Sequence, residues 1–347
     1  MCKSPLHPLL VALPKCEHHV HLEGTLSPEL LFELAAKNNI TLPSTPEYTS
    51  PTTLHTRYNA FASLDDFLSY YYIGFTVLIT PSDYESLAYA YITLAASHNV
   101  RHAEIFFDPQ VHLSRGVPIS HILSGFEAAS VKARQEYGIT SLLIPCLLRH
   151  LPVPDISFLD LFNGTGMTGF GLCSTELDKP PALYADIFTA ARARGLRVTA
   201  HAGEEGPASY VHEAITHLQV ERVDHGIRAA EDEDVMKMLA ERGTMLTVCP
   251  LSNVRLKAVR GIEEVPVRKF LDKGVRFSLN SDDPAYFGGY IMENYCAVEE
   301  AFGLGVEEWG RIVRWGVEGS WCDEGRKGEI LREVEVVLRD WRQDNGE

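Results

Sequence analysis

The amino-acid sequence predicts an α/β protein, a (β/α)8 TIM barrel, because short apolar runs alternate with helical patterns along its length. Eight such runs are predicted to be strands, and helix-like segments separate many of them. The chain has 347 residues, of which 45% are hydrophobic, so it can bury a large core. Length alone would suggest two domains, but no Gly/Ser linker or internal repeat divides the chain. We therefore expect one domain over residues 1–347.

The predicted strands share an apolar run, and most of them end in polar or Gly/Pro-rich residues. In chain order they span residues 16–22, 102–107, 142–148, 169–173, 197–201, 222–225, 245–250 and 276–282. The C-terminal ends of barrel strands meet on one face of the fold, where active sites are built. Polar residues that end these runs are therefore the first candidates for a functional site.

The predicted helices carry apolar residues at helical spacing. Residues 27–38 begin with Ser27 as N-cap and Pro28 in the first turn. Residues 43–72 are interpreted as a helical insertion after the first strand that covers the open end of the barrel. The connection over residues 148–168 is rich in turn residues, so its helix is expected to be a turn or two. Further helices are expected over residues 82–97, 119–137, 182–194, 231–242 and 266–273, and in a C-terminal segment with the stripe Ile330, Leu331, Val334, Val337 and Leu338.

The charge and the cysteines limit the partners and the compartment. A formal net charge of −16 would repel phosphate backbones and anionic lipid, so we expect neither a nucleic-acid nor a membrane partner. The seven cysteines form no C-x-x-C pair and are odd in number, which favours a reducing compartment. We expect a cytoplasmic protein, with the nucleus as a second location. No run approaches the roughly 18 apolar residues of a membrane span, and residues 9–13 are too short for a signal sequence.

Three histidines and an aspartate at predicted strand ends form a candidate metal site. In "EHHVHLE", side chains two positions apart share one face of a strand, so His19 and His21 point together. His201 ends the fifth predicted strand in "RVTAHAGEEG", and Asp282 ends the eighth in "SLNSDDPAYFGG". Any one histidine alone would be a packing residue, but the joint placement favours a metal site of N and O ligands. An open zinc site would activate water, so the prediction is metal-assisted hydrolysis with one Zn²⁺ per chain.

Further carboxylates and a histidine lie beside these ligands. Glu204 follows His201 by three residues, a position that suits a proton carrier, and Glu205 is the alternative candidate for that role. The competing interpretation is that both are solvated carboxylates at a helix start. His225 ends the run "ERVDHG" and would either orient the attacking water or be a core histidine bonded to a carbonyl. The adjacent Asp282 and Asp283 repel each other unless one meets a metal and the other a donor or proton, although "NSDDP" also suits a surface turn.

At these residues the sequence resembles a known family. In the family's order, "LPKCEHHVHLEGTL", "AEIFFDP", "GFGLCSTE", "TAHAGEE", "VDHG", "VCPLSN" and "SLNSDDPAYFGGY" resemble the motifs of the adenosine/adenine deaminase family of metal-dependent hydrolases. The resemblance implies that zinc is bound by His19, His21, His201 and Asp282. It also implies that Glu204 donates a proton to purine N1 and that His225 orients or deprotonates the water that attacks C6. Asp283 would contact ring N7, and the Gly171 backbone would meet ring N3. Loss of the amino group as ammonia completes the implied reaction.

The motif "HLEGTL" bears on which amino-purine is the substrate. Adenosine-specific members carry Asp where this chain has Glu23, and that Asp meets a ribose hydroxyl. The forms "HLEGTL" and "SDDPAYFGGYI" look like the adenine deaminases, the fungal type in particular. A longer side chain at Glu23 would occupy space that the sugar needs, so the resemblance implies conversion of adenine to hypoxanthine in purine salvage, with Glu23 in the substrate site.

Two alternatives to adenine deamination stay open. The first is a deaminase of adenosine or of an N6-substituted AMP, for which Arg149 and His150 are candidate phosphate ligands. The second is an inactive family member that acts as a binding protein. Cys173 gives the second some support, because the family usually has Asp at this position; a packing thiol is the competing interpretation. His18 replaces an apolar residue and is expected to face away from the metal.

Overall fold

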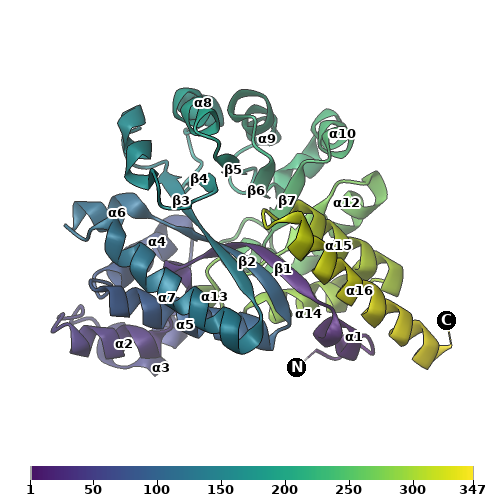
Figure 1. The fold of residues 1–347 in the computed structure, drawn as a ribbon, viewed down its shortest axis with the longest axis horizontal. Helices are drawn as coiled ribbons and strands as arrows, with labels where there is room; N and C mark the ends of the chain where they lie inside the picture. Colours follow the sequence, from purple (N-terminus) through teal and green to yellow (C-terminus); the bar gives the residue numbers. More distant parts are fainter. Residues whose placement is uncertain (1, 347) are drawn as a thin grey trace.

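Eight parallel strands form one sheet in chain order in the computed structural model, which describes residues 2–346. The strands are β1 (Lys15–His21), β2 (Val100–Phe107), β3 (Thr140–Leu148), β4 (Gly169–Cys173), β5 (Arg197–Ala202), β6 (Arg222–His225), β7 (Met245–Val248) and β8 (Phe277–Leu279). Each strand pairs in parallel with the next, and helices surround the sheet (Figure 1). The predicted (β/α)8 barrel is confirmed.

Irregular chain after β8 closes the barrel onto β1. The sequence predicted a strand to residue 282, whereas regular pairing with β7 stops at Leu279. Further on, Asp282 bridges Val20 of β1. The Asp282 N–H donates to the His19 carbonyl at 2.9 Å, and its carbonyl accepts from the His21 N–H at 2.9 Å. The Asp282 backbone, with a φ of 64°, is therefore fastened between the two histidines of β1.

Six outer helices lie close to the predicted ranges: α5 (Pro81–Ser97), α7 (Ile119–Tyr137), α8 (Ala185–Ala193), α10 (Glu233–Arg242), α12 (Val267–Lys273) and α16 (Glu324–Asn345). The sequence did not predict α9 (Ala208–Glu213), α14 (Ile291–Phe302) or α15 (Val306–Gly319). Local caps fix their ends: the Asp232 side chain accepts from two backbone N–H groups at the start of α10, and Gly243 ends that helix with a φ of 67°. Between β3 and β4 there is only the 3-10 helix η3 (Ile156–Phe162), as predicted.

The helix predicted over residues 27–38 is α2 (Pro28–Lys37), and the predicted insertion over residues 43–72 forms the helices α3 (Pro51–Tyr58) and α4 (Leu64–Phe75). Ser63 begins α4, because its side chain accepts from the backbone N–H of Asp66 at 3.2 Å. On its buried face, the ring of Phe67 packs at 5.3 Å on Tyr286, which lies in the helix α13 (Pro284–Phe287) after β8. The insertion therefore packs at the C-terminal side of the barrel, where the sequence predicted it.

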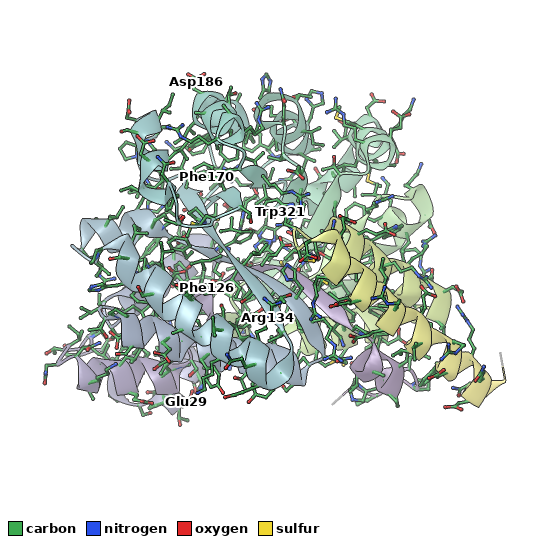
Figure 2. All side chains as sticks on the ribbon, viewed as in Figure 1. Glu29, Phe126, Arg134, Phe170, Asp186 and Trp321 are labelled. Atoms are coloured by element: carbon green, nitrogen blue, oxygen red, sulfur yellow. The ribbon has the colours of Figure 1, made fainter. Side chains whose placement is uncertain are left out.

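Buried aromatic and charged side chains fill the remaining space. Phe170 of β4 packs at 5.3 Å on Phe188 of α8, between the sheet and the outer helices (Figure 2). Inside the barrel, Glu104 of β2 accepts from the Arg222 guanidinium of β6 and from the backbone N–H of Trp321. Helix α16 buries three residues of its predicted stripe, Ile330, Val334 and Leu338. Within residues 2–346, no helix is both long and apolar enough to cross a membrane.

Candidate active site

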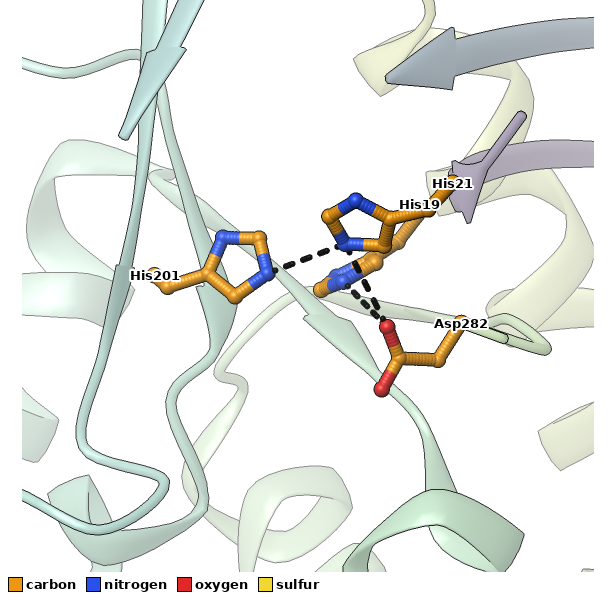
Figure 3. A group of neighbouring side chains, drawn as sticks. All are labelled: His19, His21, His201 and Asp282. Carbon is orange, nitrogen blue, oxygen red and sulfur yellow. Dashed lines mark hydrogen bonds and ion pairs between the residues drawn. The ribbon is translucent and has the colours of Figure 1, made fainter. Parts of the chain in front are cut away.

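Four buried side chains converge at the C-terminal end of the strands (Figure 3). His19 and His21 come from β1, His201 from β5, and Asp282 from the segment after β8. Asp282 Oδ1 lies 3.1 Å from His19 Nε2 and 3.4 Å from His21 Nε2. The Nε2 atoms of His21 and His201 are 3.3 Å apart, and one donor atom of each residue lies within 4.8 Å of the others. The structure thus brings together the four residues predicted as metal ligands.

The donor set of this cluster fits a divalent metal ion. Three imidazole nitrogens and a carboxylate oxygen match the ligands of open zinc sites. His19 Nε2 is buried and makes no hydrogen bond among residues 2–346, although Asp282 Oδ1 lies 3.1 Å away, which suits a nitrogen and an oxygen that face the same metal ion. Burial acts to raise the pKa of Asp282, but the imidazoles of His19, His225 and His21 outweigh it and hold this pKa well below its usual range. The carboxylate is therefore available as an anionic ligand.

Asp224 orients two of the imidazoles and was not singled out from the sequence. Its Oδ2 atom lies 3.3 Å from His201 Nδ1, and its Oδ1 atom accepts from Thr199 at 2.8 Å and from Thr247 at 3.0 Å. The Thr247 hydroxyl also contacts His19 Nδ1 at 2.9 Å. Partners of this kind fix the tautomer and orientation of ligand histidines. Asp224 lies in the motif "VDHG", which carries the resemblance to the family but does not by itself indicate that Asp224 orients ligand histidines.

Ser252 holds the fourth ligand from the helix after β7. Its hydroxyl donates to Asp282 Oδ2 at 2.5 Å, which leaves Oδ1 facing His19 and His21. Ser252 belongs to α11 (Pro250–Arg255) and to the quoted motif "VCPLSN". The motif resembles those of the deaminase family, but nothing in its local pattern indicates which of its polar residues faces the site.

Glu204 lies on the turn after β5, and Glu176 fixes that turn. The Glu176 carboxylate accepts from the backbone N–H groups of Gly203, Glu204 and Gly206 at 2.9, 2.9 and 3.1 Å. Asn253 donates to Glu204 Oε1 at 3.0 Å. Burial raises the pKa of Glu204 well above its usual range, and the carboxylates of Asp282 and Glu176 add to this effect. Burial and the neighbouring charges thus favour the protonated form of this carboxyl.

His225 connects Glu204 to the metal ligands. Its Nε2 atom lies 3.4 Å from Glu204 Oε2 and 3.9 Å from Asp282 Oδ2, while its Nδ1 atom faces Asn253 Nδ2 at 3.3 Å. Burial lowers the pKa of His225 well below its usual range, and the nearby His19 contributes. The imidazole is therefore neutral and able to accept a proton. The sequence left a core histidine as an alternative, and the structure instead places His225 at the cluster.

Glu205, the rival of Glu204, lies outside the cluster. Its Oε2 atom accepts from the backbone N–H of Glu176 at 3.2 Å and from the Thr175 hydroxyl at 3.4 Å. The side chain is half-buried on the outer side of the turn. Its position supports the choice of Glu204 as the carboxyl beside the metal.

A cavity opens beside the cluster. The α4 helix covers it with apolar and aromatic side chains, and polar groups from the strand ends form the opposite wall. Its lining comprises His21, Leu64, Phe67, Leu68, Tyr71, Tyr72, Asp108, Leu148, Cys173, Ser174, His201, Glu204, His225, Leu256, Asp282 and Asp283. Burial, together with Asp282 and Asp108, raises the pKa of Asp283 well above its usual range. Residue 24 has to be glycine for the Asp283 carboxyl to lie here, because a Cβ on Gly24 would lie 2.0 Å from Asp283 Oδ1.

The structure places two predicted substrate contacts elsewhere. Gly171 does not line the cavity, because it lies within β4 opposite Cys146, two residues before the strand ends; Cys173 and Ser174 reach the cavity instead. Glu23 is not among the residues that line the cavity, and its Oε1 atom lies 2.6 Å from His112 Nε2. Its Oε2 atom is buried without a hydrogen-bond partner among the described residues, and the blocking of the sugar by Glu23 stays a prediction.

The residues that depart from the family's pattern have clear positions. His18 faces away from the cluster, as predicted, and its ring nitrogens contact Ser278 Oγ at 3.0 Å and Ser320 Oγ at 2.8 Å. Cys173 is buried in the cavity wall, and its thiol donates to Asp108 Oδ1 at 3.4 Å. Burial raises the pKa of this thiol well above its usual range, so Cys173 is a neutral donor.

Arg149, one of the two candidate phosphate ligands, is turned into the protein. Its guanidinium is fully buried and donates to the His201 carbonyl at 2.5 Å. His150 is exposed, and its Nδ1 atom lies 2.8 Å from the Ser174 hydroxyl. Among the described residues, no lysine or arginine lines the cavity. A phosphate group would therefore find no cationic side chain there.

Fold and site chemistry together define an enzyme of the metal-dependent hydrolase class. Barrel enzymes of this kind place ligands and proton carriers at the C-terminal strand ends, and both groups lie there in this chain. The chain belongs to the adenosine deaminase family, whose model, described as "Adenosine deaminase", matches residues 14–337.

Curated and solved relatives agree with this membership. The protein named "Adenine deaminase" from Gibberella zeae is 52% identical over 99% of both chains, and that of Schizosaccharomyces pombe is 49% identical over 98% of this chain and 95% of its own. The solved adenine deaminase of Arthrobacter aurescens is 40% identical with a TM-score of 0.90, covering 94% of this chain and 99% of that chain. A solved amidohydrolase with bound Zn from Burkhoderia ambifaria is 26% identical, with a TM-score of 0.85 over 98% and 97%.

Proposed function

We propose that this chain hydrolyses adenine to hypoxanthine and ammonia, a step of purine salvage. Relatives that share about half of its residues over nearly the full length carry the name adenine deaminase. The observation on this chain that supports the chemistry is the placement of Glu204 and His225 beside Asp282 in one cavity. A protonated carboxyl, a neutral imidazole and a metal-ligand cluster are the groups that hydrolytic removal of an amino group requires.

The metal ion of this proposal is zinc, one per chain, held by His19, His21, His201 and Asp282. The relative with bound Zn and the donor set both support this choice. When bound, the ion lowers the pKa of water and so supplies a nucleophile at neutral pH. Asp224 and Ser252 would hold His201 and Asp282 in the orientation that binding requires.

Glu204 and His225 are proposed to move the protons. Glu204 carries a proton at neutral pH and gives it to purine N1, which makes C6 electrophilic. His225, a neutral imidazole, takes a proton from the water that attacks C6. The water oxygen bonds to C6, and His225 passes the proton that it took to the amino nitrogen. The bond from C6 to this nitrogen then breaks, ammonia leaves, and the proton of the C6 hydroxyl returns to Glu204 as the carbonyl of hypoxanthine forms. Asp283, with its raised pKa, retains a proton that it donates to N7.

A nucleotide substrate is the second candidate and has less support. Solved N6-methyl-AMP deaminases of Arabidopsis thaliana are 16% identical to this chain, so they support the common fold alone. The lack of a cationic side chain among the described residues of the cavity, with Arg149 bonded to His201, speaks against phosphate binding.

We further propose that residues 1–347 act as one domain in the cytoplasm and nucleus, consistent with seven cysteines that are all free.

Product analysis tests the proposed reaction. Purified protein loaded with zinc is incubated with adenine, and hypoxanthine and ammonia are quantified separately. Equal amounts of the two products, formed at a rate that falls on chelation and returns with zinc, are the expected result. Ammonia without hypoxanthine, or turnover unaffected by chelation, would show that the reaction or the metal is wrong.

A further inference from the structure

Two cysteines and a histidine form a second cluster of potential metal ligands, away from the active site. The members of this N-terminal thiol cluster are Cys2, His7 at the start of α1 (His7–Ala12), and Cys296 in α14. One donor atom of each lies within 4.8 Å of the others. Among residues 2–346, every other grouping of this kind contains His21 or Asp282 and so belongs to the active site. The thiol cluster is therefore separate from the chemistry described above.

Hydrogen bonds bring the first residues of the chain to α14. The Lys3 N–H donates to Glu300 Oε1 at 2.8 Å. The Ser4 hydroxyl donates to Glu299 Oε1 at 2.6 Å, and the other oxygen of this carboxylate accepts from an indole N–H of α15 at 2.8 Å. Cys296 precedes the two glutamates by three and four residues, so all three side chains lie on one face of α14. The residues that follow Cys2 are thus bonded to the face that carries Cys296.

The His7 imidazole faces the Cys296 thiol. Its helix is held in place by Leu9 and Leu10, which are fully buried. His7 Nδ1 lies 3.7 Å from Cys296 Sγ. A zinc ion with bonds of about 2.05 Å to nitrogen and about 2.3 Å to sulfur, at the tetrahedral angle, separates the two atoms by about 3.6 Å. The observed separation therefore matches two ligands of one ion.

The surroundings of Cys296 favour a cation over a disulfide. Burial, together with Cys2, raises the pKa of the Cys296 thiol to about 12, and the carboxylates of Glu293 and Glu300 add to this effect. A disulfide forms by attack of a thiolate, so these surroundings disfavour a bond between Cys2 and Cys296. A metal ion displaces the thiol proton when it binds, and the two carboxylates attract its charge.

The cluster lies at the N-terminal end of the barrel strands, opposite the active site. Lys15 begins β1, and its ammonium group donates to the carbonyls of Leu10 and Leu13 at 2.6 and 2.9 Å. These bonds fix α1 at the start of β1. Helix α1 also packs against α14 (Figure 1). At this end of a barrel, side chains serve stability, whereas catalytic groups lie at the other end.

We propose that Cys2, His7 and Cys296 bind a second zinc ion, which fastens residues 2–7 to α14 and takes no part in the deamination. Two thiolates and an imidazole are ligands typical of zinc. All three side chains are only partly buried, so water can reach the fourth position. This ion is additional to the one proposed for the active site. The inference does not rest on the proposed function, because the two sites share no residue.

Cobalt(II) is the probe that tests the inference. A thiolate bound to Co²⁺ gives an intense charge-transfer band in the near ultraviolet, whereas the nitrogen and oxygen ligands of the active-site cluster give none. Metal-free protein, with any affinity tag at its C-terminus and with a phosphine reductant present, is titrated with Co²⁺. We expect two ions to bind per chain and the band to accompany one of them.

The Cys2→Ser and Cys296→Ser variants should each weaken the band. The double variant should lose it and bind one ion per chain. Its turnover of adenine with zinc should stay within about threefold of the original value, as for substitutions away from the chemistry. Zinc should raise the melting temperature of the unmodified protein by more than that of the double variant, because a ligand stabilises the fold that binds it. Cys322→Ser, at another partly buried cysteine, is the matched control and should keep the band.

Several results would overturn the inference. A band that persists in the double variant would place the thiolate elsewhere, at Cys173 or Cys249 beside the active site. The inference is also wrong if the unmodified protein shows no band, or if mass spectrometry without reductant finds a disulfide between Cys2 and Cys296 in protein that binds one ion only. A band that saturates only with cobalt in large excess would contradict a built site. A folded double variant without turnover would contradict the separation from catalysis. Absence of adenine turnover in protein that shows the band would count against the proposed function alone.

Discussion

Glu204 has two carboxylate neighbours, Asp282 and Glu176, and a buried position, which together raise its pKa well above the usual range. Glu204→Gln removes that acid while preserving the size of the side chain. We expect kcat on adenine to fall by roughly 100-fold or more, because general acid catalysis contributes on the order of 10²–10⁴. Steady-state kinetics at neutral pH measure the effect, with zinc content as a check on the metal site.

Glu205→Gln is the control for this variant, because it changes the neighbouring carboxyl on the outer side of the same turn. Its kcat should stay within about threefold of the original value, as for most substitutions away from the chemistry. A Glu204→Gln protein that keeps zinc and full turnover would show that another group protonates the ring.

His201 is the ligand that comes from the far side of the barrel, and Asp224 orients it. His201→Asn should lower the affinity for zinc by more than roughly 100-fold, because loss of an outer partner alone costs about 10–100-fold. Competition with a chromophoric chelator measures that affinity. His212→Asn, at an exposed histidine of α9, serves as the control. Unchanged zinc affinity in the His201 variant would remove it from the ligand set.

The sequence predicted the ligands better than the substrate contacts. Strand alternation places His19 and His21 on one face, and the order of strands brings His201 and Asp282 to the same end. The direction in which Glu23 turns depends on His112, which is 89 residues away and lies on another element. Asp108 was likewise part of a quoted motif, but its burial beside Cys173 is a tertiary contact that spacing does not indicate.

At the scale of elements, α4 is the part of the insertion that forms the cavity wall. Leu68 lines the cavity and is only partly buried, so its truncation should cost little stability. We expect Leu68→Ala to raise KM for adenine by roughly 3- to 10-fold, because the apolar contact with the ring is worth about 1 kcal/mol. Steady-state kinetics give KM and kcat separately, and kcat should change little.

Ser69→Ala changes the next residue of α4, which is exposed, and should leave KM unchanged. If both variants had the KM of the unmodified protein, α4 would cover the cavity without touching the substrate. A KM that rises in both would indicate a change in the helix as a whole.

The order and type of elements followed from periodicity, whereas the barrel closure did not. The apolar run after residue 276 reads as a strand to residue 282, but regular pairing ends at Leu279. The remaining residues adopt their conformation because they bond to β1, more than 250 residues earlier in the chain. Long-range pairing of this kind decides the backbone of Asp282, and local sequence does not report it.

At the scale of the whole molecule, the barrel interior depends on the buried pair of Glu104 and Arg222. Burial acts to raise the pKa of Glu104, but Arg222 and His102 outweigh it and hold this pKa well below its usual range. Because the folded pKa is lower than the unfolded one, the contribution to stability is present above about pH 4.5 and is lost as pH falls towards the folded value. Denaturant unfolding between pH 3 and 7 should show this loss.

Glu104→Gln should lower the free energy of unfolding at pH 7 by about 3–5 kcal/mol, because it leaves Arg222 buried without a counter-charge. It should also reduce the slope of stability against pH in the acid range. Glu329→Gln, at an exposed partner of Arg326, is the control and should cost less than about 1 kcal/mol. A Glu104 variant as stable as the control would show that the pair does not support the barrel.

We expect this member of the adenosine deaminase family to act on adenine as the free base. The most direct test is kcat/KM of the purified, zinc-loaded protein for adenine and for adenosine, followed by the change in ultraviolet absorbance on deamination. We expect kcat/KM for adenine to exceed that for adenosine by at least roughly 100-fold, because a site shaped for the free base rejects a sugar at N9. A higher kcat/KM for adenosine than for adenine would contradict it.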